Sequence, residues 1–366
     1  MSDSQSGTWS APGRVNLIGD HTDYNGGFAL PFALPLRTTV TAARRDDRTV
    51  AAGSVGHDAI EFETPGEPGA VDGWGAYVAG VAWALAESGV EVPGADLEIA
   101  TDVPLGAGLS SSHSLECSVA LALTGLAGLD IEATELAKIV QRVENDYVGS
   151  PTGLLDQMAI LHSRAGHLSF FDARALTVEP VECDPAAAGL ELLVVDSQAP
   201  HELVDGAYAE RRRACEAAAR RLGVETLREV DDVGAALDAL ADDPETQRRA
   251  RHVLTENQRV LDCVELVRGG QLADIGPLLS ASHASMRDDF ENTVPAVDLI
   301  VETAVEAGAL GARMTGGGFG GAVIALVPVE RRAAVERAVT TAALGAGHPA
   351  PSYLPVVPSP GAGRDT

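Results

Sequence analysis

Residues 12–27, PGRVNLIGDHTDYNGG, carry a dense set of side chains that can form directional polar bonds. These side chains are Arg14, Asn16, Asp20, His21, Thr22, Asp23 and Asn25. Apolar residues lie among and after them, so the pattern predicts an apolar strand that enters a polar turn and continues beyond it. Such turns present binding groups on a rigid scaffold, and this mixture suits a ligand covered in hydroxyl groups, such as a sugar. The alternative is a solvated turn, but Arg14 and His21 do not serve turn geometry.

Two glycine-rich segments could approach a ligand or each other closely. Gly106, Gly108 and the serines at 110–112 precede a helix marked by apolar residues at 115, 119, 123 and 126. Free N–H groups and the positive dipole end at a helix start can bind polyphosphate without lysine. An ordinary helix cap is the alternative. The second segment, residues 316–321, precedes an apolar strand and is also compatible with a hairpin turn.

The chain contains a single lysine, Lys138, and its formal net charge is −27. One lysine within a predicted helix excludes a Walker A loop and the strand lysine of protein kinases. The negative charge argues against binding to nucleic acid or to an anionic membrane. Any nucleotide site must therefore be a local exception, formed by backbone N–H groups, arginine and a metal ion. Salt adaptation and a biased genome are both open explanations of this composition.

The length of 366 residues allows two domains with a sizeable core. The sequence contains no run of about 18 apolar residues, so it predicts no membrane span. The first residues, MSDSQSG, lack the basic and apolar regions of a signal peptide. We therefore expect a cytoplasmic protein. The four cysteines are scattered without a CxxC pair, which argues against a disulfide framework or a zinc site.

Hydrophobic periodicity predicts alternating strands and helices. The expected strands are residues 38–43, 97–101, 190–196 and 322–327. The expected helices are residues 74–87, 115–126, 136–147, 209–222, 244–268, 297–307 and 331–343. We place a domain change near residues 186–189, with domains at 1–187 and 188–366. Gly308 suits the position after a helix end, and the Gly- and Pro-rich tail from Pro358 onward is expected to fray.

Asp156 follows residues that suit the start of a helix. Pro151 and Thr152 suit a helix start, which would place Asp156 in or near the first helical turn. The helix dipole there favours an ionised carboxylate. A neighbouring Arg14 would lower the pKa of Asp156 further.

These segments together resemble the motifs of one enzyme family. Residues 12–27 resemble the sugar-binding segment of the galactokinase branch of the GHMP kinases. Residues 104–116 resemble the phosphate loop of that family, residues 153–157 (GLLDQ) its catalytic-aspartate segment, and residues 314–321 (MTGGGFGG) its third motif. The resemblance implies an α+β fold of two domains. The N-terminal domain would be ribosomal-protein-S5-domain-2-like and the C-terminal domain ferredoxin-like, with the active site in the cleft between them.

The resemblance also implies a reaction and a set of site residues. ATP would phosphorylate the anomeric hydroxyl of galactose, with Asp156 accepting its proton and Arg14 stabilising charge on the phosphoryl group. The implied sugar ligands are Asp20, His21, Asp23, the backbone of Gly153, and Tyr208. The implied ATP site comprises Gly106, Gly108, Leu109, Ser110, Ser111 and Ser112, with Trp74 and Tyr77 beside adenine. Ser112 and Glu144 would hold Mg²⁺, and Gly316, Gly317 and Gly318 would support the phosphate loop. We expect a monomer, with a dimer as the alternative.

Two residues depart from the family pattern. His113 stands where the family has alanine, and it would either contact phosphate as a cation or only repack the loop. Asp20 replaces a glutamate that holds the 6-hydroxyl, so its shorter side chain must reach through water or shift its backbone. A kinase of a related sugar, such as N-acetylgalactosamine or arabinose, and a sensor without turnover are therefore alternatives. The full-length serine loop with Asp156 and Arg14 favours an enzyme.

Overall fold

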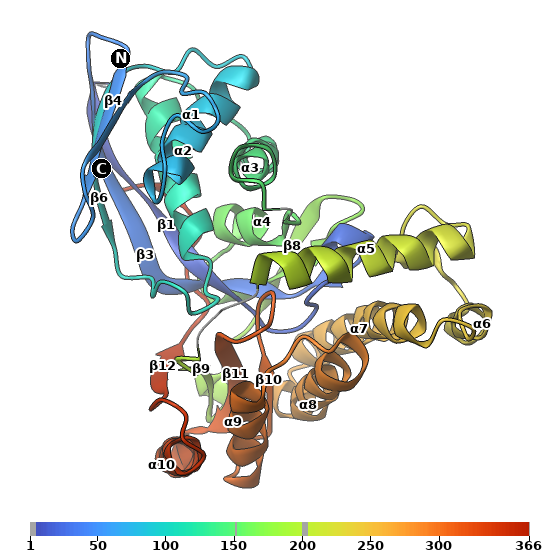
Figure 1. Cartoon of the computed structure of the whole chain (residues 1–366). Helices are drawn as coiled ribbons and strands as arrows, with labels where there is room; N and C mark the ends of the chain where they lie inside the picture. The colour runs from blue at the N-terminus through green and yellow to red at the C-terminus, as the bar shows by residue number, and fades with distance from the viewer. Residues whose placement is uncertain (1–4, 151, 200–203, 366) are drawn as a thin grey trace.

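The computed structural model describes residues 5–150, 152–199 and 204–365 (Figure 1). Within these residues the strands form three sheets, of six, four and three strands. The N-terminal half, blue to green in Figure 1, lies above the C-terminal half, which runs from light green to red and whose last residues return to the N-terminal sheet. The fold is therefore α+β with two halves, as the sequence predicts.

The six-stranded sheet forms the frame of the N-terminal half. Its order is β13 (Gly363–Arg364), β1 (Ser6–Asn16), β3 (Pro31–Arg44), β6 (Ala95–Thr101), β4 (Thr49–Ser54) and β5 (Ile60–Glu63). The helices of this half are α1 (Gly75–Glu87), α2 (Ser111–Leu126), α3 (Ala133–Arg142) and α4 (Leu155–His162). Helix α2 packs on β1 and β3, where Val40, Leu97 and Leu123 belong to one buried apolar cluster. Burial of this cluster fixes the start of α2 beside the end of β1.

A three-stranded sheet links the two halves. It consists of β2 (Phe28–Ala29), β7 (His167–Asp172) and β8 (Thr177–Glu182). Phe28 belongs to an apolar cluster that also contains Val260 of α7 (Pro244–Arg268) and Ile324 of β11 (Ala322–Pro328). The polar turn between β1 and β2 is thereby held between the two halves.

The four-stranded sheet of the C-terminal half is antiparallel throughout. Its order is β10 (Gly311–Met314), β11 (Ala322–Pro328), β9 (Leu190–Asp196) and β12 (Ser352–Val356). Between β9 and β10 the chain forms α5 (Val204–Leu222), α6 (Val233–Ala239), α7 (Pro244–Arg268), α8 (Gly276–Ser285) and α9 (Pro295–Glu306), and α10 (Arg332–Gly345) precedes β12. The order of elements is the βαββαβ pattern of a ferredoxin-like fold, with extra helices inserted in the first connection.

Short helical turns complete the description. They are Asp23–Asn25, Ala186–Ala188, Leu227–Glu229, Leu272–Ile275 and Val329–Arg331 in 3₁₀ form, and Val143–Val148 and Met286–Phe290 in π form. The π turn at Val143–Val148 continues α3 and contains Glu144. Gly80 makes room for it, since a Cβ atom there would lie 2.6 Å from Cγ1 of Val143.

Most predicted elements are confirmed, with shifted ends. The predicted helix 244–268 matches α7, and the predicted strand 190–196 matches β9. The predicted helix 136–147 is α3 followed by the π turn. Gly308, with φ of 113°, follows the last residues of α9 as expected. Helix α4 begins at Leu155, so Asp156 lies in its first turn, whereas Pro151 lies outside the described residues.

The prediction that the tail frays from Pro358 is wrong. Strand β13 pairs with β1, where Arg364 lies opposite Trp9. Arg37 donates hydrogen bonds to the carbonyl oxygens of Pro360 and Gly361, both at 2.9 Å. These partners satisfy backbone groups that would otherwise need water. The C-terminal residues thus complete the N-terminal sheet, and the domain boundary at 187/188 stays a prediction.

Among the described helices, none combines the length and apolar character that crossing a membrane requires.

Candidate functional site

A cavity of about 170 Å³ lies where the turn after β1, the start of α4, α5 and the glycine loop after β10 meet. Its lining comprises Arg14, Asp20, His21, Asp23, Ser150, Thr152, Gly153, Leu155, Asp156, Tyr208, Gly316 and Gly317. The cavity is smaller than the ~300–1,000 Å³ typical of pockets for drug-sized ligands. It therefore suits a small polar molecule, and the structure brings the predicted catalytic and sugar-binding residues together there.

Arg14 and Asp156 form a two-point ion pair at this cavity. Nε of Arg14 donates to Oδ1 of Asp156 at 2.6 Å, and Nη2 donates to Oδ2 at 2.8 Å. Nη1 of Arg14 donates to the carbonyl oxygen of Gly108 at 2.7 Å. The planar guanidinium group thus links Asp156 to the glycine-serine loop, residues 106–112, a geometry that the point charge of lysine cannot reproduce.

Asp156 is held in its ionised form. Burial raises the pKa of Asp156, but the charge of Arg14 and hydrogen bonds from Arg14 and Ser110 outweigh burial and lower that pKa to about 2. Oγ of Ser110 donates to Oδ2 of Asp156 at 2.6 Å. A carboxylate with so low a pKa accepts protons weakly, so its main capacity is to orient a hydroxyl group and Arg14.

Asp23 reaches the start of α4 through the space left by Gly153. Its Oδ2 accepts a hydrogen bond from the N–H of Leu155 at 3.3 Å, whereas a Cβ atom on Gly153 would lie only 1.7 Å from that oxygen. Burial raises the pKa of Asp23 to about 6, helped by the charges of Asp156 and Asp20. The glycine is required by this close approach.

His21 is a neutral, fixed residue of the turn. Its φ of 63° is unusual for a residue other than glycine. Nδ1 lies 2.9 Å from the hydroxyl of Tyr24, and Nε2 lies 3.0 Å from the carbonyl oxygen of Gly317. Burial lowers the pKa of His21 to about 3. Since both ring nitrogens have protein partners, the imidazole shapes the cavity wall more than it offers free hydrogen bonds.

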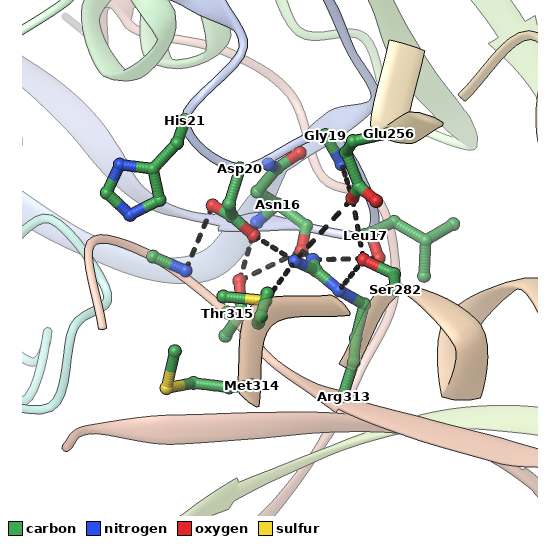
Figure 2. A network of polar contacts seen from close by, with 12 residues as sticks. Asn16, Leu17, Gly19, Asp20, His21, Glu256, Ser282, Arg313, Met314 and Thr315 are labelled. Carbon is green, nitrogen blue, oxygen red and sulfur yellow. Dashed lines mark hydrogen bonds and ion pairs between the residues drawn. The ribbon is translucent and has the colours of Figure 1, made fainter. Parts of the chain in front are cut away.

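Asp20 lies in a buried polar network with Arg313, which Figure 2 shows. Nη2 of Arg313 donates to Oδ2 of Asp20 at 2.5 Å, and the N–H of Gly316 donates to Oδ1 at 3.2 Å. Burial raises the pKa of Asp20 against the lowering effect of the Arg313 charge. The shorter acid at this position thus has two protein partners before any ligand arrives.

Arg313 itself is fully buried and was not singled out from the sequence. It also donates to the carbonyl oxygens of Asn16 and Leu17, both at 3.2 Å (Figure 2). Ser282 and Glu256 complete the network: Arg313 donates to Oγ of Ser282, which donates to Glu256 at 2.6 Å. A lone arginine next to the third glycine motif was the only signal for this network in the sequence.

In the glycine-serine loop, the side chains of Leu109 and Ser110 contact the protein, whereas backbone N–H groups remain available at the start of α2. Ser110 precedes α2 with φ of 58° and makes no side-chain cap, because its hydroxyl binds Asp156. The side chain of Leu109 is buried, and its carbonyl oxygen accepts the N–H of Arg14 at 3.1 Å. Gly106 and Gly108 have φ of 72° and 74°. The loop therefore offers backbone N–H groups at the start of a 16-residue helix.

The third glycine motif lies against that loop. A Cβ atom on Gly316 would be 3.2 Å from the carbonyl oxygen of Gly108. Gly317 packs beside the Tyr208 ring, and a Cβ atom on Gly318 would lie 2.5 Å from the carbonyl oxygen of Asn292. Close backbone contact between distant segments accounts for these glycines.

Trp74 and Tyr77 are not among the described residues that line the cavity. Trp74 precedes α1 and donates its ring N–H to the carbonyl oxygen of Asp58 at 3.1 Å. Its ring centroid lies 5.7 Å from that of His57. Part of its surface packs against the N-terminal apolar cluster.

The predicted magnesium ligands lie beside two further polar residues. Ser112 Oγ is 3.3 Å from Nδ1 of His113, whose Nε2 is 3.8 Å from Oε1 of Glu144. Glu144 is buried, and neither carboxylate oxygen of fully buried Glu116 has a hydrogen-bond partner among the described residues. Buried oxygens without donors fit a divalent cation, which would supply the missing positive charge.

Family models match most segments that carry these residues. A galactokinase galactose-binding signature matches residues 2–44. The N-terminal domain of GHMP kinases matches residues 76–164, and their C-terminal domain matches residues 263–344. The matched regions contain the Arg14 turn, the serine loop, Asp156 and the third glycine motif.

Full-length relatives agree with these matches. A galactokinase of Mycobacterium tuberculosis is 51% identical over 359 residues, covering 97% of this chain and 98% of the relative. A galactokinase of Streptomyces coelicolor is 48% identical over 363 residues, covering 98% and 94%.

Solved structures extend the similarity to three dimensions. Lactococcus lactis galactokinase complexed with galactose has a TM-score of 0.92 and 34% identity, covering 98% of this chain and 95% of that one. A mevalonate kinase shares the fold alone, with a TM-score of 0.68 and 15% identity over 96% and 98% of the two chains. With near-complete coverage at about half identity, this chain belongs to the galactokinase family of the GHMP kinases.

Proposed function

We propose that this chain transfers the γ-phosphoryl group of ATP to the anomeric hydroxyl of galactose, giving galactose 1-phosphate and ADP. The observation that carries the proposal is the Arg14–Asp156 pair at the 170 Å³ cavity, joined through Gly108 to the loop before α2. The cavity beside the pair suits a sugar, and the loop before α2, which Arg14 contacts at Gly108, suits a polyphosphate. Membership of the galactokinase family supports the same reaction.

Asp156 orients the attacking hydroxyl. The sugar oxygen bonds to the γ-phosphorus as the bond to the bridging oxygen breaks, and ADP leaves with that electron pair. The hydroxyl proton passes to Asp156. With a pKa near 2, the carboxylate holds this proton only briefly, so positioning contributes more than basicity. Phosphoryl transfer depends chiefly on positioning and electrostatics, which makes such a weak base sufficient.

Arg14 supplies positive charge beside the transferring group, while the polyphosphate lies on N–H groups of the loop and of α2. Lysine is not needed there, and Lys138 pairs with Glu135 at 2.6 Å on the exposed side of α3. Ser111 and Ser112, in the first turn of α2, offer hydroxyls to phosphate. Trp74 and Tyr77 are proposed to flank adenine.

Ser112 and Glu144 would hold Mg²⁺ together with phosphate oxygens. Mg²⁺ prefers oxygen ligands and keeps several waters, so one hydroxyl and one carboxylate suffice. When bound, the ion neutralises charge on the phosphates.

We propose that Asp23 is the main sugar-binding residue and that the backbone of Gly153 and the side chain of Tyr208 also contact the sugar. Asp20 and His21 have protein partners for their polar atoms, so they act more on the shape of the pocket. We propose that the chain acts as a monomer.

The test is ADP release from MgATP with a panel of hexoses and pentoses, followed by phosphorus NMR of the product. Galactose should give the highest kcat/KM, and the product signal should be that of a 1-phosphate. Absence of galactose-dependent ADP release would contradict the proposal. A preference for N-acetylgalactosamine or arabinose would retain the chemistry and change the substrate.

A further inference from the structure

Three buried side chains form a compact cluster beside the catalytic aspartate. His113 and Glu116 come from the first turns of α2, and Glu144 comes from the π turn after α3. One ligand atom from each lies within 4.8 Å of the others. The exposed fractions of the three residues are only 7%, 0% and 5%.

The cluster has unmet polar groups. Both carboxylate oxygens of Glu116 and Nε2 of His113 are buried without a hydrogen-bond partner among the described residues. Leaving such groups unpaired is costly, because water cannot compensate them inside the protein. The carboxylates of Glu116 and Glu144 lie together in this buried cluster, so two acidic groups share it. The site therefore requires a positive charge or a proton.

His113 is oriented to offer a lone pair to this cluster. Nδ1 lies 3.3 Å from Oδ2 of Asp156 and also 3.3 Å from Oγ of Ser112, two oxygens that can accept its hydrogen, whereas Nε2 lies 3.8 Å from Oε1 of Glu144. When Nδ1 carries the hydrogen, Nε2 is unprotonated and can bind a metal. Carboxylates fix metal-binding histidines in this way in many proteins.

We propose that His113, Glu116 and Glu144 form a site for one divalent transition-metal ion, such as Mn²⁺ or Zn²⁺, that binds without sugar or nucleotide. An imidazole nitrogen favours transition metals, whereas Mg²⁺ prefers oxygen ligands and water. Metal–ligand bonds of about 2.0–2.2 Å need ligand atoms roughly 3–4 Å apart. Only small side-chain movements separate the observed cluster from that arrangement.

This inference goes beyond the proposed phosphoryl transfer, with which it shares only Glu144. The position of His113 beside Asp156 also means that the ion would lie next to the catalytic pair. The histidine, which stands where the family has alanine, supplies the nitrogen ligand that distinguishes this site from one made of oxygen alone.

The test is a Mn²⁺ titration of the full chain without sugar or nucleotide, followed by electron paramagnetic resonance. We expect one ion per chain and a nitrogen coupling in the spin-echo spectrum. His113→Ala should abolish that coupling and weaken binding at least about tenfold, comparable with the loss of other metal-site partners. Glu116→Gln, which preserves shape, should weaken binding to a similar extent. The exposed His57 provides the matched control, since His57→Ala should change neither signal.

A parent protein that binds no Mn²⁺ under these conditions would overturn the inference, as would an unchanged nitrogen coupling in folded His113→Ala. If that variant does not fold, by circular dichroism, the parent spectrum and Glu116→Gln decide the question. Galactose-dependent ADP release with Mg²⁺ is measured in parallel. An active parent without Mn²⁺ binding overturns the metal site alone, and Mn²⁺ binding without ADP release overturns the proposed function alone.

Discussion

Asp20 and Arg313 lie 293 residues apart in the chain, yet Nη2 of Arg313 donates a hydrogen bond to Oδ2 of Asp20 in the interior. The pair joins the turn after β1 to the end of β10, and so connects the two halves behind the cavity. Arg313 has no exposed surface. Its buried positive charge is therefore stabilised by Asp20, by Glu256 at 4.0 Å and by backbone carbonyl oxygens.

Replacing Asp20 should destabilise the protein. Asp20→Asn removes the nearest negative charge from buried Arg313, and breaking such a pair costs about 3–5 kcal/mol. Urea denaturation measures this loss. In the exposed pair of Glu179 with Arg268, the control Glu179→Gln should change the unfolding free energy by at most about 1 kcal/mol. Equal effects of the two changes would show that the buried pair is not needed for stability.

Gly153→Ala should impair sugar binding. The new Cβ atom would lie 1.7 Å from Oδ2 of Asp23, so the carboxylate must leave its position. We expect the galactose KM to rise at least about tenfold, because a displaced Asp23 loses its hydrogen bonds. Gly206→Ala is the control, since a Cβ atom there meets nothing within 4 Å. Unchanged KM for Gly153→Ala would remove Asp23 from sugar recognition.

Asp156→Asn should lower kcat by at least about 10² while sugar affinity stays within about tenfold. The amide keeps the shape of the side chain but loses its charge and its ability to accept the proton. Steady-state kinetics and equilibrium sugar binding together measure the two effects. A nearly normal kcat would exclude Asp156 from the mechanism.

Arg14→Lys should lower kcat at least about tenfold, because an ammonium group cannot replace the two-point contact with Asp156 and the contact with Gly108 at once. Turnover with saturating galactose and MgATP is the measurement. Arg45→Lys, at an exposed ion pair, is the control. If Arg14→Lys retains more than half of the parental turnover, Arg14 serves the fold rather than the reaction.

Stability should fall as the pH falls from about 6.5 toward 4, in part through His252. Burial lowers the pKa of His252 to about 4 in the folded protein, whereas the unfolded chain takes up that proton near 6.5. The unfolded state thus binds more protons in this window, with a limiting slope of about 1.4 kcal/mol per pH unit for one group. His252→Gln should flatten the dependence measured by urea denaturation. A slope identical to the parent's would show that His252 does not contribute.

The sequence by itself determined the family, the order of the elements and the position of Asp156 in a first helical turn. Those inferences rest on local patterns: apolar periodicity, glycine where the backbone must turn, and short motifs. The predicted helix 244–268 and strand 190–196 needed no distant information. Local patterns did not predict the ordered tail, because it depends on Arg37 donating to carbonyl groups more than 300 residues away.

Only the tertiary structure decided which polar residues of the site pair with one another. Ser110 donates its hydroxyl to Asp156, and Asp20 is paired with Arg313. No spacing in the sequence indicates these contacts, because each joins segments that approach only when separate apolar clusters pack. The same packing brings His113 and Glu144 together from different helical segments. Burial then sets their electrostatics, since a group's charge depends on which neighbours replace water around it.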